Sequence, residues 1–234
     1  MQGRKAFEEI FSLIAKTGDA RLEASALEML IELLLQQGEL ATAEERFAQR
    51  EKLSQERKLE DEVERSSTRA QLAFYRGDHE QAEALARKVA DAWKARNTAG
   101  SELEARELLV RVLLESGKGA PVKEELARLQ ALSGSDGDGL AHGAWARMTA
   151  CYEAELGDAR VGLGLLEKLL RQKELRMFRR HELTLSLIRA LARLGQRDAA
   201  KARLATLTEE AKRQSFGIVV ARAETLGKAL LSTR

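Results

Sequence analysis

Proline, cysteine and aromatic residues are all scarce in this chain of 234 residues. It contains one proline, Pro121, one cysteine, Cys151, and 4% aromatic residues, whereas 44% of its residues are hydrophobic and 32% are charged. A single cysteine excludes an internal disulfide and a cysteine-based metal cluster. Strands favour β-branched and aromatic residues, so this composition, rich in Ala, Leu, Glu, Arg and Lys, predicts packed helices and no sheet.

Long hydrophobic runs are also missing. No stretch approaches the roughly 18 uninterrupted apolar residues of a membrane-spanning helix, and the N-terminal residues MQGRKAFEEIF lack the apolar centre of a signal peptide. We therefore expect a cytoplasmic protein with no membrane partner.

Charge is nearly balanced overall but unevenly distributed along the chain. Residues 1–158 hold 22 Lys and Arg against 30 Asp and Glu, a net charge of −8, and residues 159–234 hold 17 against 7, a net charge of +10. The two parts sum to the overall +2. The sequence thus has a charge dipole, acidic in its first part and basic in its last part. Such a dipole affects how a protein associates with other molecules.

Five glycines recur at nearly constant spacing. Gly38, Gly77, Gly117, Gly157 and Gly195 are separated by 39, 40, 40 and 38 residues, and such a period is typical of a structural repeat. The residue five positions after each glycine is small in four of five cases, and the residue seven positions before it is apolar or small. These two sets are Ala43, Ala82, Val122, Gly162 and Ala200, and Ile31, Ala70, Val110, Ala150 and Ile188.

This repeat predicts helical hairpins. A glycine in the left-handed conformation ends the first helix without steric cost, and the Glu or Asp that follows three of the glycines favours the start of the second. A small residue one turn into the second helix lets the two backbones approach closely. We expect twelve helices, at residues 4–16, 20–37, 40–57, 60–76, 79–96, 100–116, 121–132, 139–156, 159–173, 177–194, 197–213 and 217–232.

On these residues the chain resembles the tetratricopeptide repeat (TPR) superfamily, in a long-repeat form found in bacterial multidomain regulators. The resemblance covers almost the whole chain, but its period exceeds the family's usual length and the proline that normally closes each repeat is absent. It implies an all-α, right-handed solenoid built from a half repeat (1–18), five repeats (20–58, 60–98, 100–134, 139–175 and 177–214) and a final helix (217–232). The matching positions are Leu30, Ile31, Leu34, Gly38, Glu39, Ala43 and Phe47 in the first repeat and Leu187, Ile188, Leu191, Gly195, Ala200 and Leu204 in the fifth.

The array begins with a segment that aligns as the second helix of a hairpin. We therefore expect the chain to be a piece of a larger protein, one that carries a kinase, ATPase or DNA-binding domain elsewhere.

Candidate catalytic and metal-binding groups are few and dispersed. His79, His142 and His181 fall in different repeats, no two of them have metal-ligand spacing, and no phosphate-binding loop is present. The segment SGSDGDG at 133–139 has no third or twelfth calcium ligand in the required register, so it reads as a loop. Cys151 reads as a small buried hydrophobe rather than a nucleophile. We expect no enzyme activity, no cofactor and no metal.

Surface side chains carry the functional hypotheses. In the TPR family the first helix of each hairpin lines a concave groove that holds partner segments, and the resemblance places twelve residues in such a groove, running from acidic to basic. Phe74 and Tyr75 are the candidate aromatic anchors. The twelve are Glu28, Glu32, Gln71, Phe74, Tyr75, Glu107, Arg111, Glu115, Arg147, Cys151, Arg189 and Arg193.

A basic stretch, RQKELRMFRRHE at 171–182, forms a second candidate surface. Clustered arginines neutralise phosphates, so nucleic acid is one interpretation, and a solvated corner or a site for an acidic protein is the alternative. Interleaved glutamates and the lack of stacking aromatics favour the alternative. The basic residues are Arg171, Lys173, Arg176, Arg179 and Arg180.

Three function hypotheses follow. The leading one is a non-catalytic scaffold that binds a protein or peptide, as the C-terminal regulatory or sensor part of a bacterial multidomain regulator. The second is self-association, in which the acidic part of one copy meets the basic part of another. The third is nucleic-acid binding through the basic stretch.

Overall fold

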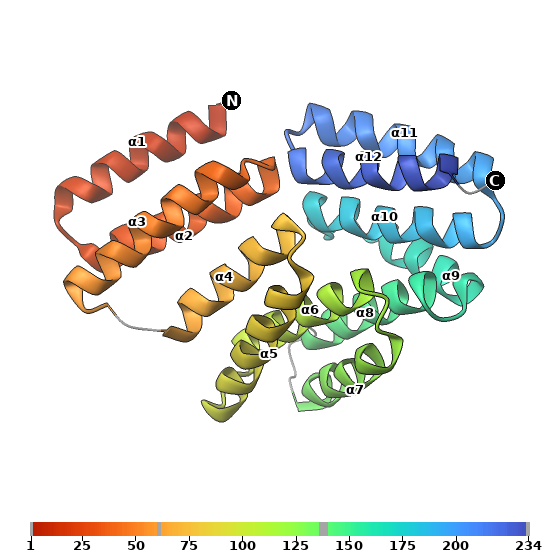
Figure 1. Ribbon diagram of the computed structural model, residues 1–234, viewed down its shortest axis with the longest axis horizontal. Coiled ribbons are helices and arrows are strands. Elements are labelled where there is room, and N and C mark those ends of the chain that lie inside the picture. Colours follow the sequence, from red (N-terminus) through yellow and green to blue (C-terminus); the bar gives the residue numbers. More distant parts are fainter. Residues whose placement is uncertain (1, 60–61, 136–139, 233–234) are drawn as a thin grey trace.

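The computed structural model describes residues 2–59, 62–135 and 140–232, and within these ranges the chain forms twelve α-helices and no strand (Figure 1). Each helix lies within a few residues of its predicted range; α7 and α9 differ most, because α7 is longer at both ends and α9 ends earlier. The tip of the loop predicted at 133–139 lies outside the described residues. The helices are α1 (Gln2–Thr17), α2 (Ala20–Gln37), α3 (Leu40–Arg57), α4 (Glu62–Arg76), α5 (His79–Ala95), α6 (Ala99–Glu115), α7 (Gly119–Ser135), α8 (Leu140–Glu155), α9 (Ala159–Leu170), α10 (Met177–Arg193), α11 (Arg197–Arg213) and α12 (Gly217–Ser232).

Four of the five hairpin turns close as predicted. Gly38 has φ 76°, and the turn is held by bonds from Gly38 N to Leu35 O (3.1 Å) and from Glu39 N to Leu34 O (2.9 Å). This pattern satisfies the last carbonyls of the helix and needs a left-handed residue, which glycine adopts without strain. The same geometry occurs at Gly77, Gly117 and Gly195.

The fifth turn departs from the prediction. Gly157 is not among the residues with positive φ, and its N–H donates to Tyr152 O at 2.9 Å. A Cβ on Gly157 would lie 2.3 Å from the Glu153 carboxylate, so a side chain there would have to displace this carboxylate from the turn. That carboxylate accepts a bond from Asp158 N (2.8 Å) and so occupies the inside of the turn.

Aspartates begin three of the helices. Asp19 accepts from Arg21 N and Leu22 N, Asp78 accepts from Gln81 N, and Asp158 accepts from two N–H groups at the start of α9. Such caps satisfy helix N–H groups that have no intrahelical partner. Glu39 makes no side-chain cap of this kind, so only the two aspartates that follow hairpin glycines confirm the prediction.

The small residues lie where helix backbones approach. Ala43, Ala82, Val122 and Ala200 are completely buried, and Gly162 is buried as well. A Cβ on Gly162 would lie 2.1 Å from Ala154 N, so α9 crosses α8 at backbone contact. The register inferred from the glycine spacing is therefore confirmed.

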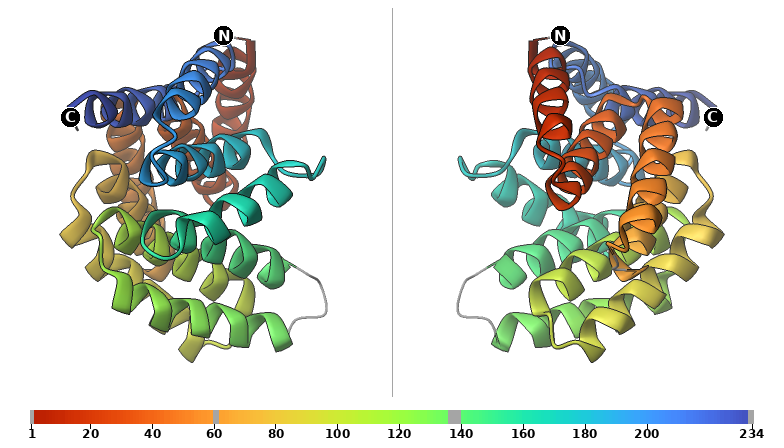
Figure 2. Two further views of the ribbon diagram at one scale, coloured as in Figure 1. Left: turned by 90° about the vertical axis from the view of Figure 1, so that its right-hand side faces the viewer. Right: turned by 90° about the vertical axis from the view of Figure 1, so that its left-hand side faces the viewer.

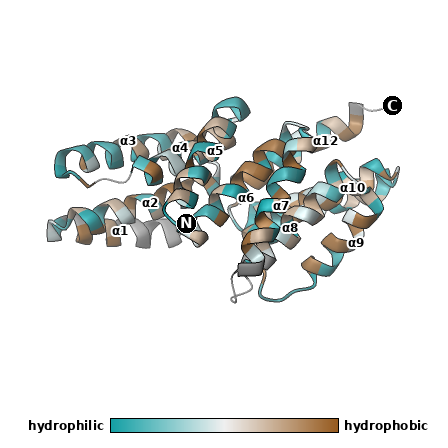
Figure 3. Ribbon diagram, turned by 90° about the horizontal axis from the view of Figure 1, so that it is seen from below, coloured by the Kyte–Doolittle hydropathy of each residue, from teal (hydrophilic) through white to brown (hydrophobic). Residues whose placement is uncertain are grey.

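The core is divided between the first hairpin and the rest of the array. A small cluster, which includes Leu34 and Phe47, joins α2 and α3 and reaches α4 through Leu72 and Tyr75, whereas the main core runs from α4 to α12. Near the N-terminal end of the array, α3 is coloured mainly hydrophilic (Figure 3). The first hairpin thus depends on few apolar contacts with its neighbour.

The curvature of the array brings its two ends together. The red and blue terminal helices share one side of the molecule and the green α7 lies on the opposite side (Figure 2). The start of α12 meets the end of α2 (Figure 1), and a Cβ on Gly217 would lie 2.0 Å from Gln37 O. The array therefore curls around its concave face, with α12 completing the circuit.

Candidate functional site

A groove of three adjoining pockets occupies the concave face. The central pocket, about 430 Å³ with the open solvent it contains, lies among α6, α8, α10 and α12. It is lined by Glu107, Arg111, Leu114, Glu115, Arg147, Met148, Cys151, Glu155, Arg179, Glu182, Leu183, Ser186, Arg189 and Arg222.

Two further pockets extend the groove on either side. The outer chamber, about 1060 Å³, is bounded by α2, α4, α6 and residues 176–179, and it shares Glu107, Arg111 and Arg179 with the central pocket. The α12 pocket, about 990 Å³, lies between α4 and α12 and shares Glu115, Arg189 and Arg222. The first helices of successive hairpins supply most of the lining, as the resemblance implied.

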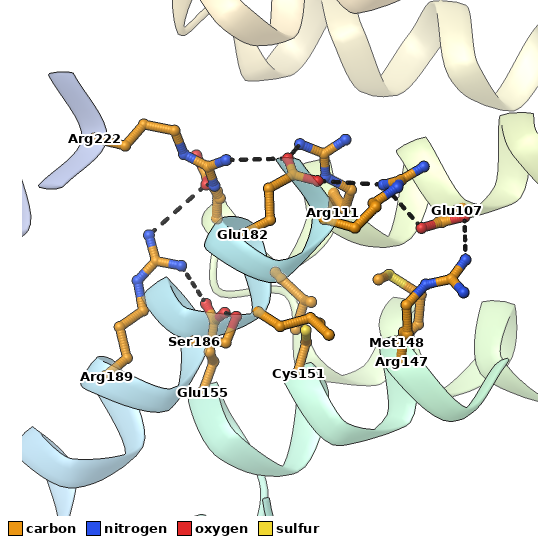
Figure 4. A pocket seen from close by; sticks show the side chains of 14 residues that line it. Glu107, Arg111, Arg147, Met148, Cys151, Glu155, Glu182, Ser186, Arg189 and Arg222 are labelled. Atoms are coloured by element: carbon orange, nitrogen blue, oxygen red, sulfur yellow. Dashed lines mark hydrogen bonds and ion pairs between the residues drawn. The ribbon is translucent and has the colours of Figure 1, made fainter. Parts of the chain in front are cut away.

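Ion pairs fill the central pocket (Figure 4). Arg189 lies 3.0 Å from Glu155, and Arg147 lies 3.2 Å from Glu107. Arg179 joins Glu107 at 2.9 Å. The remaining pairs are Arg111–Glu182, Arg222–Glu115, Arg222–Glu182 at 3.5 Å, Arg179–Glu182 at 3.3 Å and Arg189–Glu115 at 3.7 Å.

This network has five arginines and four glutamates, so the two signs alternate within the pocket. The predicted change from acidic to basic along the groove is therefore wrong for its centre. Pairing across helices explains the difference, because α6, which carries Glu107 and Glu115, faces the arginines of α10 and α12.

Burial and pairing act in opposite directions on the charged groups. Burial favours the neutral form of Arg111, but Glu182 together with Tyr75 and Glu107 outweighs it and raises the pKa of the guanidinium. Burial likewise opposes ionisation of Glu115, yet Arg222 and Arg189 hold its carboxyl pKa below the usual value. These groups stay charged, so the pocket presents fixed charges on fixed helices.

Aromatic rings adjoin the network. The rings of Phe74 and Tyr75 lie 5.2 Å apart, and the Arg111 guanidinium carbon lies 4.9 Å from the centre of the Phe74 ring. Arg222 approaches the same ring at 5.7 Å. Phe74 is buried beneath these arginines, whereas the half-buried Tyr75 lines both the outer chamber and the α12 pocket, so Tyr75 is the better candidate for a ligand contact.

The outer chamber contains three glutamates and three arginines. Glu32, Glu104 and Glu107 line it together with Arg111, Arg176 and Arg179. Burial raises the pKa of the Glu104 carboxyl, and repulsion from Glu107 adds to the effect. Positive charge is therefore favourable at this position of the groove.

Cys151 lines the central pocket but is a poor nucleophile. Burial raises the pKa of its thiol to about 12, and the nearby Glu155 carboxylate adds to the shift. The thiolate is the reactive form, so this cysteine is unreactive near neutral pH.

The structure brings together ten of the twelve predicted groove residues. Glu28 instead lies in a separate pocket, where it accepts bonds from Arg50 Nη2 (2.7 Å) and Thr68 Oγ1 (2.9 Å). Arg193 caps the end of α8 by donating to Ala154 O and Gly157 O, each at 2.9 Å.

The basic stretch does not form one surface. Arg179 turns into the groove and pairs with Glu107, and Arg180 caps the end of α9 through Leu170 O and Gln172 O. Arg176 lines the outer chamber, whereas Arg171 and Lys173 are exposed and line none of the three pockets. The arginines are adjacent in the sequence, but they do not share one surface in the structure.

Sequence reasoning assigned no groove position to several lining residues, among them Glu182, Met148 and Arg222. Glu182 was seen only as an interruption of the basic stretch, and Met148 as part of a helix. Arg222 was missed because α12 was assigned as a terminal helix with no groove position, and only the curvature of the array brings it to Glu115, 107 residues earlier. For Glu182 a signal existed, since it lies seven residues, about two turns, before Arg189 and therefore on the same face of α10.

Within the described part of the chain, no three His, Cys, Asp or Glu side chains are placed to hold a metal ion. Among those same residues, none of the helices combines the length and apolar character needed to cross a membrane.

Comparisons with known proteins bear on the fold. No family model and no curated protein matches this sequence. The crystal structure of NprR in complex with its cognate peptide NprX is similar at a TM-score of 0.72 and 12% identity, over 98% of this chain and 69% of that one. The apo form of RapI is similar at a TM-score of 0.51 and 16% identity, over 98% of this chain and 65% of that one, so this chain spans less than two thirds of RapI. The chain, whose described residues form twelve helices, has the TPR-like helical-repeat fold of these two proteins.

Proposed function

We propose that this chain is a non-enzymatic regulatory scaffold that binds an extended peptide, free or as a segment of a partner protein, in its concave groove. The observation that carries the proposal is the continuity of the three pockets, in the central one of which the charged side chains are held in place by pairing across four helices. Because these charged side chains are already held in position, the protein loses less conformational entropy when a ligand binds, which favours affinity. The similarity of the fold to that of NprR, seen with a peptide bound, supports the same reading.

The lining also suggests the ligand's character. In an extended segment, backbone carbonyl groups can accept hydrogen bonds from the arginines and backbone amide groups can donate to the glutamates. Tyr75 offers an aromatic contact. In the outer chamber a lysine, an arginine or a free amino terminus fits best beside Glu104, because Glu107 and Glu32 repel the negative charge of its carboxylate. We also propose, as the sequence predicts, that the chain works as the regulatory part of a larger regulator.

The groove can be tested without disturbing its ion pairs. Gln71 is a half-buried groove residue outside the network, so Gln71→Trp should obstruct the outer chamber while the fold is retained. Peptides selected from a displayed random library on the wild-type chain should bind this variant at least about tenfold more weakly, which corresponds to roughly 1.4 kcal/mol. Circular dichroism checks the fold.

Lys201→Trp, an equally bulky change at an exposed position on α11, is the matched control and should bind like the wild type. If library selection yields no saturable binder, or if both tryptophan variants bind equally well, the groove is not the ligand site.

Two other functions receive less support. Self-association through the charge dipole loses part of its basis, because Arg222 and Arg179 already pair with Glu115 and Glu107 of the same chain. Nucleic-acid binding loses its basic surface, since Arg179 and Arg180 are used internally.

A further inference from the structure

A separate polar pocket lies between the first two hairpins. It encloses about 890 Å³ with the solvent it contains, and it shares no residue with the groove. Residues from α2, α3, the end of α3 and α4 line it: Arg21, Ala24, Ser25, Glu28, Arg50, Ser54, Lys58, Leu59, Glu64 and Arg65.

The lining is rich in positive charge. It contains four basic side chains and two carboxylates, a net charge of +2, together with the hydroxyl groups of Ser25 and Ser54. In the central pocket, by contrast, five arginines face four glutamates. One of the basic residues, Arg65, also pairs at 2.5 Å with Glu62, which lies outside the lining. A positive concave surface with hydroxyl donors favours a small anion.

Arg50 is the unusual member of this pocket. Its side chain is only 6% exposed, and its Nη2 atom is 2.7 Å from Glu28 and 3.8 Å from Glu64. Its Nε and Nη1 atoms are buried and have no hydrogen-bond partner. Buried charged donors are normally satisfied, so this pair of donors points to a missing acceptor.

Arg106 shows what a completed buried arginine looks like in the same protein. It is 2% exposed, and its Nε and Nη1 atoms donate to Glu102 and Glu125, each at 2.7 Å. The same two atoms are the ones that lack partners in Arg50. In Arg106 carboxylates therefore satisfy both Nε and Nη1, whereas in Arg50 the two neighbouring carboxylates approach only Nη2, beside an open pocket.

We propose that this pocket is an oxyanion site, in which a phosphate or carboxylate group accepts a hydrogen bond from Arg50 and is neutralised by Arg21, Lys58 and Arg65. Charged oxygen acceptors form the strongest hydrogen bonds with guanidinium groups. The bound group would bridge α2 and α3 to α4, at the junction where the first hairpin has its own small core. The site is independent of the peptide groove.

Binding of inorganic phosphate to the full chain tests the proposal. Phosphate is titrated at constant ionic strength, with sodium chloride as the balancing salt, while phosphorus NMR line width and the thermal midpoint are recorded. Saturable broadening and a rising midpoint are expected, because a ligand that binds only the folded state stabilises it. Succinate in a parallel titration distinguishes the two sources, since a midpoint that rises with succinate alone assigns the site to carboxylates.

Variants locate the effect. Lys58→Gln changes an exposed rim residue, so it should fold normally and weaken binding by roughly tenfold, the loss of one charged contact. Arg50→Gln should abolish saturation. Arg197→Gln, an exposed charge loss on α11, and the groove variant Gln71→Trp should both bind like the wild type. The proposal is overturned if neither anion acts beyond the chloride control, or if Lys58→Gln and Arg197→Gln behave alike.

Discussion

Two glycines on α9, two positions apart, have opposite structural roles. Gly162 is buried at the crossing with α8, and a Cβ there would lie 2.1 Å from Ala154 N, whereas a Cβ on Gly164 would meet nothing within 4 Å. In a helix interior alanine is intrinsically favoured over glycine by about 1 kcal/mol. Whether a methyl group helps or harms is therefore decided by the neighbouring backbone, one residue at a time.

Gly162→Ala should destabilise the protein by about 1–3 kcal/mol, because the overlap with the α8 backbone exceeds the gain in helix propensity. Gly164→Ala should stabilise it by up to about 1 kcal/mol. Chemical denaturation midpoints of the two variants measure the difference. Equal midpoints would contradict the crossing of α8 and α9 at these residues.

At the scale of elements, α12 has a role that a terminal helix need not have. Its first residue packs on the carbonyl of Gln37 at the end of α2, and Arg222, further along, enters the central pocket and pairs with Glu115. Stability in repeat arrays is approximately a sum of contacts between neighbours, but this contact joins the first full hairpin to the last helix. α12 thus couples the closure of the array to the geometry of the groove.

Gly217→Ala should weaken this closure, since the added Cβ would lie 2.0 Å from Gln37 O. We expect faster amide hydrogen exchange across α12 and a lower thermal midpoint, corresponding to roughly 1–3 kcal/mol. Gly100→Ala, near the start of α6, is the control, because its Cβ would meet nothing within 4 Å. Unchanged exchange in α12 would show that the contact with α2 is dispensable.

At the scale of the whole molecule, the charge dipole of the sequence is folded back on itself. The acidic part contributes Glu107 and Glu115 from α6, and the basic part contributes Arg179, Arg189 and Arg222 from α10 and α12. Charges that lie far apart along the chain are within about 4 Å in space, where attraction is strong in a partly buried pocket. These charges are thus paired within one molecule, so they are less available to bind a second copy of the chain.

We therefore expect light scattering to give a molar mass near 26.0 kDa at both low and high salt. Exposed charge contacts between copies would weaken as salt shortens the screening length from about 30 Å at 0.01 M to about 8 Å at 0.15 M. A mass that rises at low salt and falls at high salt would restore self-association as a function of the chain.

Much of the fold could be predicted because it depends on local rules. Glycine at a left-handed turn, a small residue at a helix crossing and apolar periodicity are all visible within one repeat, and the buried Ile31, Val110 and Ile188 confirm them. Gly157 was the exception, because its neighbour Glu153 occupies the turn. The candidate site was less predictable, since which side chains meet depends on the path of the whole array.

The sequence by itself determined the number of helices, their turns and the registers of their buried faces, because each is a property of residues a few positions apart. Only the tertiary structure decided that Arg222 meets Glu115, that Arg111 meets Glu182 and that Arg50 is buried with donors to spare. The physical reason is that a small rotation between successive repeats accumulates along the array. Its total, which no single repeat encodes, sets which distant charges share a pocket.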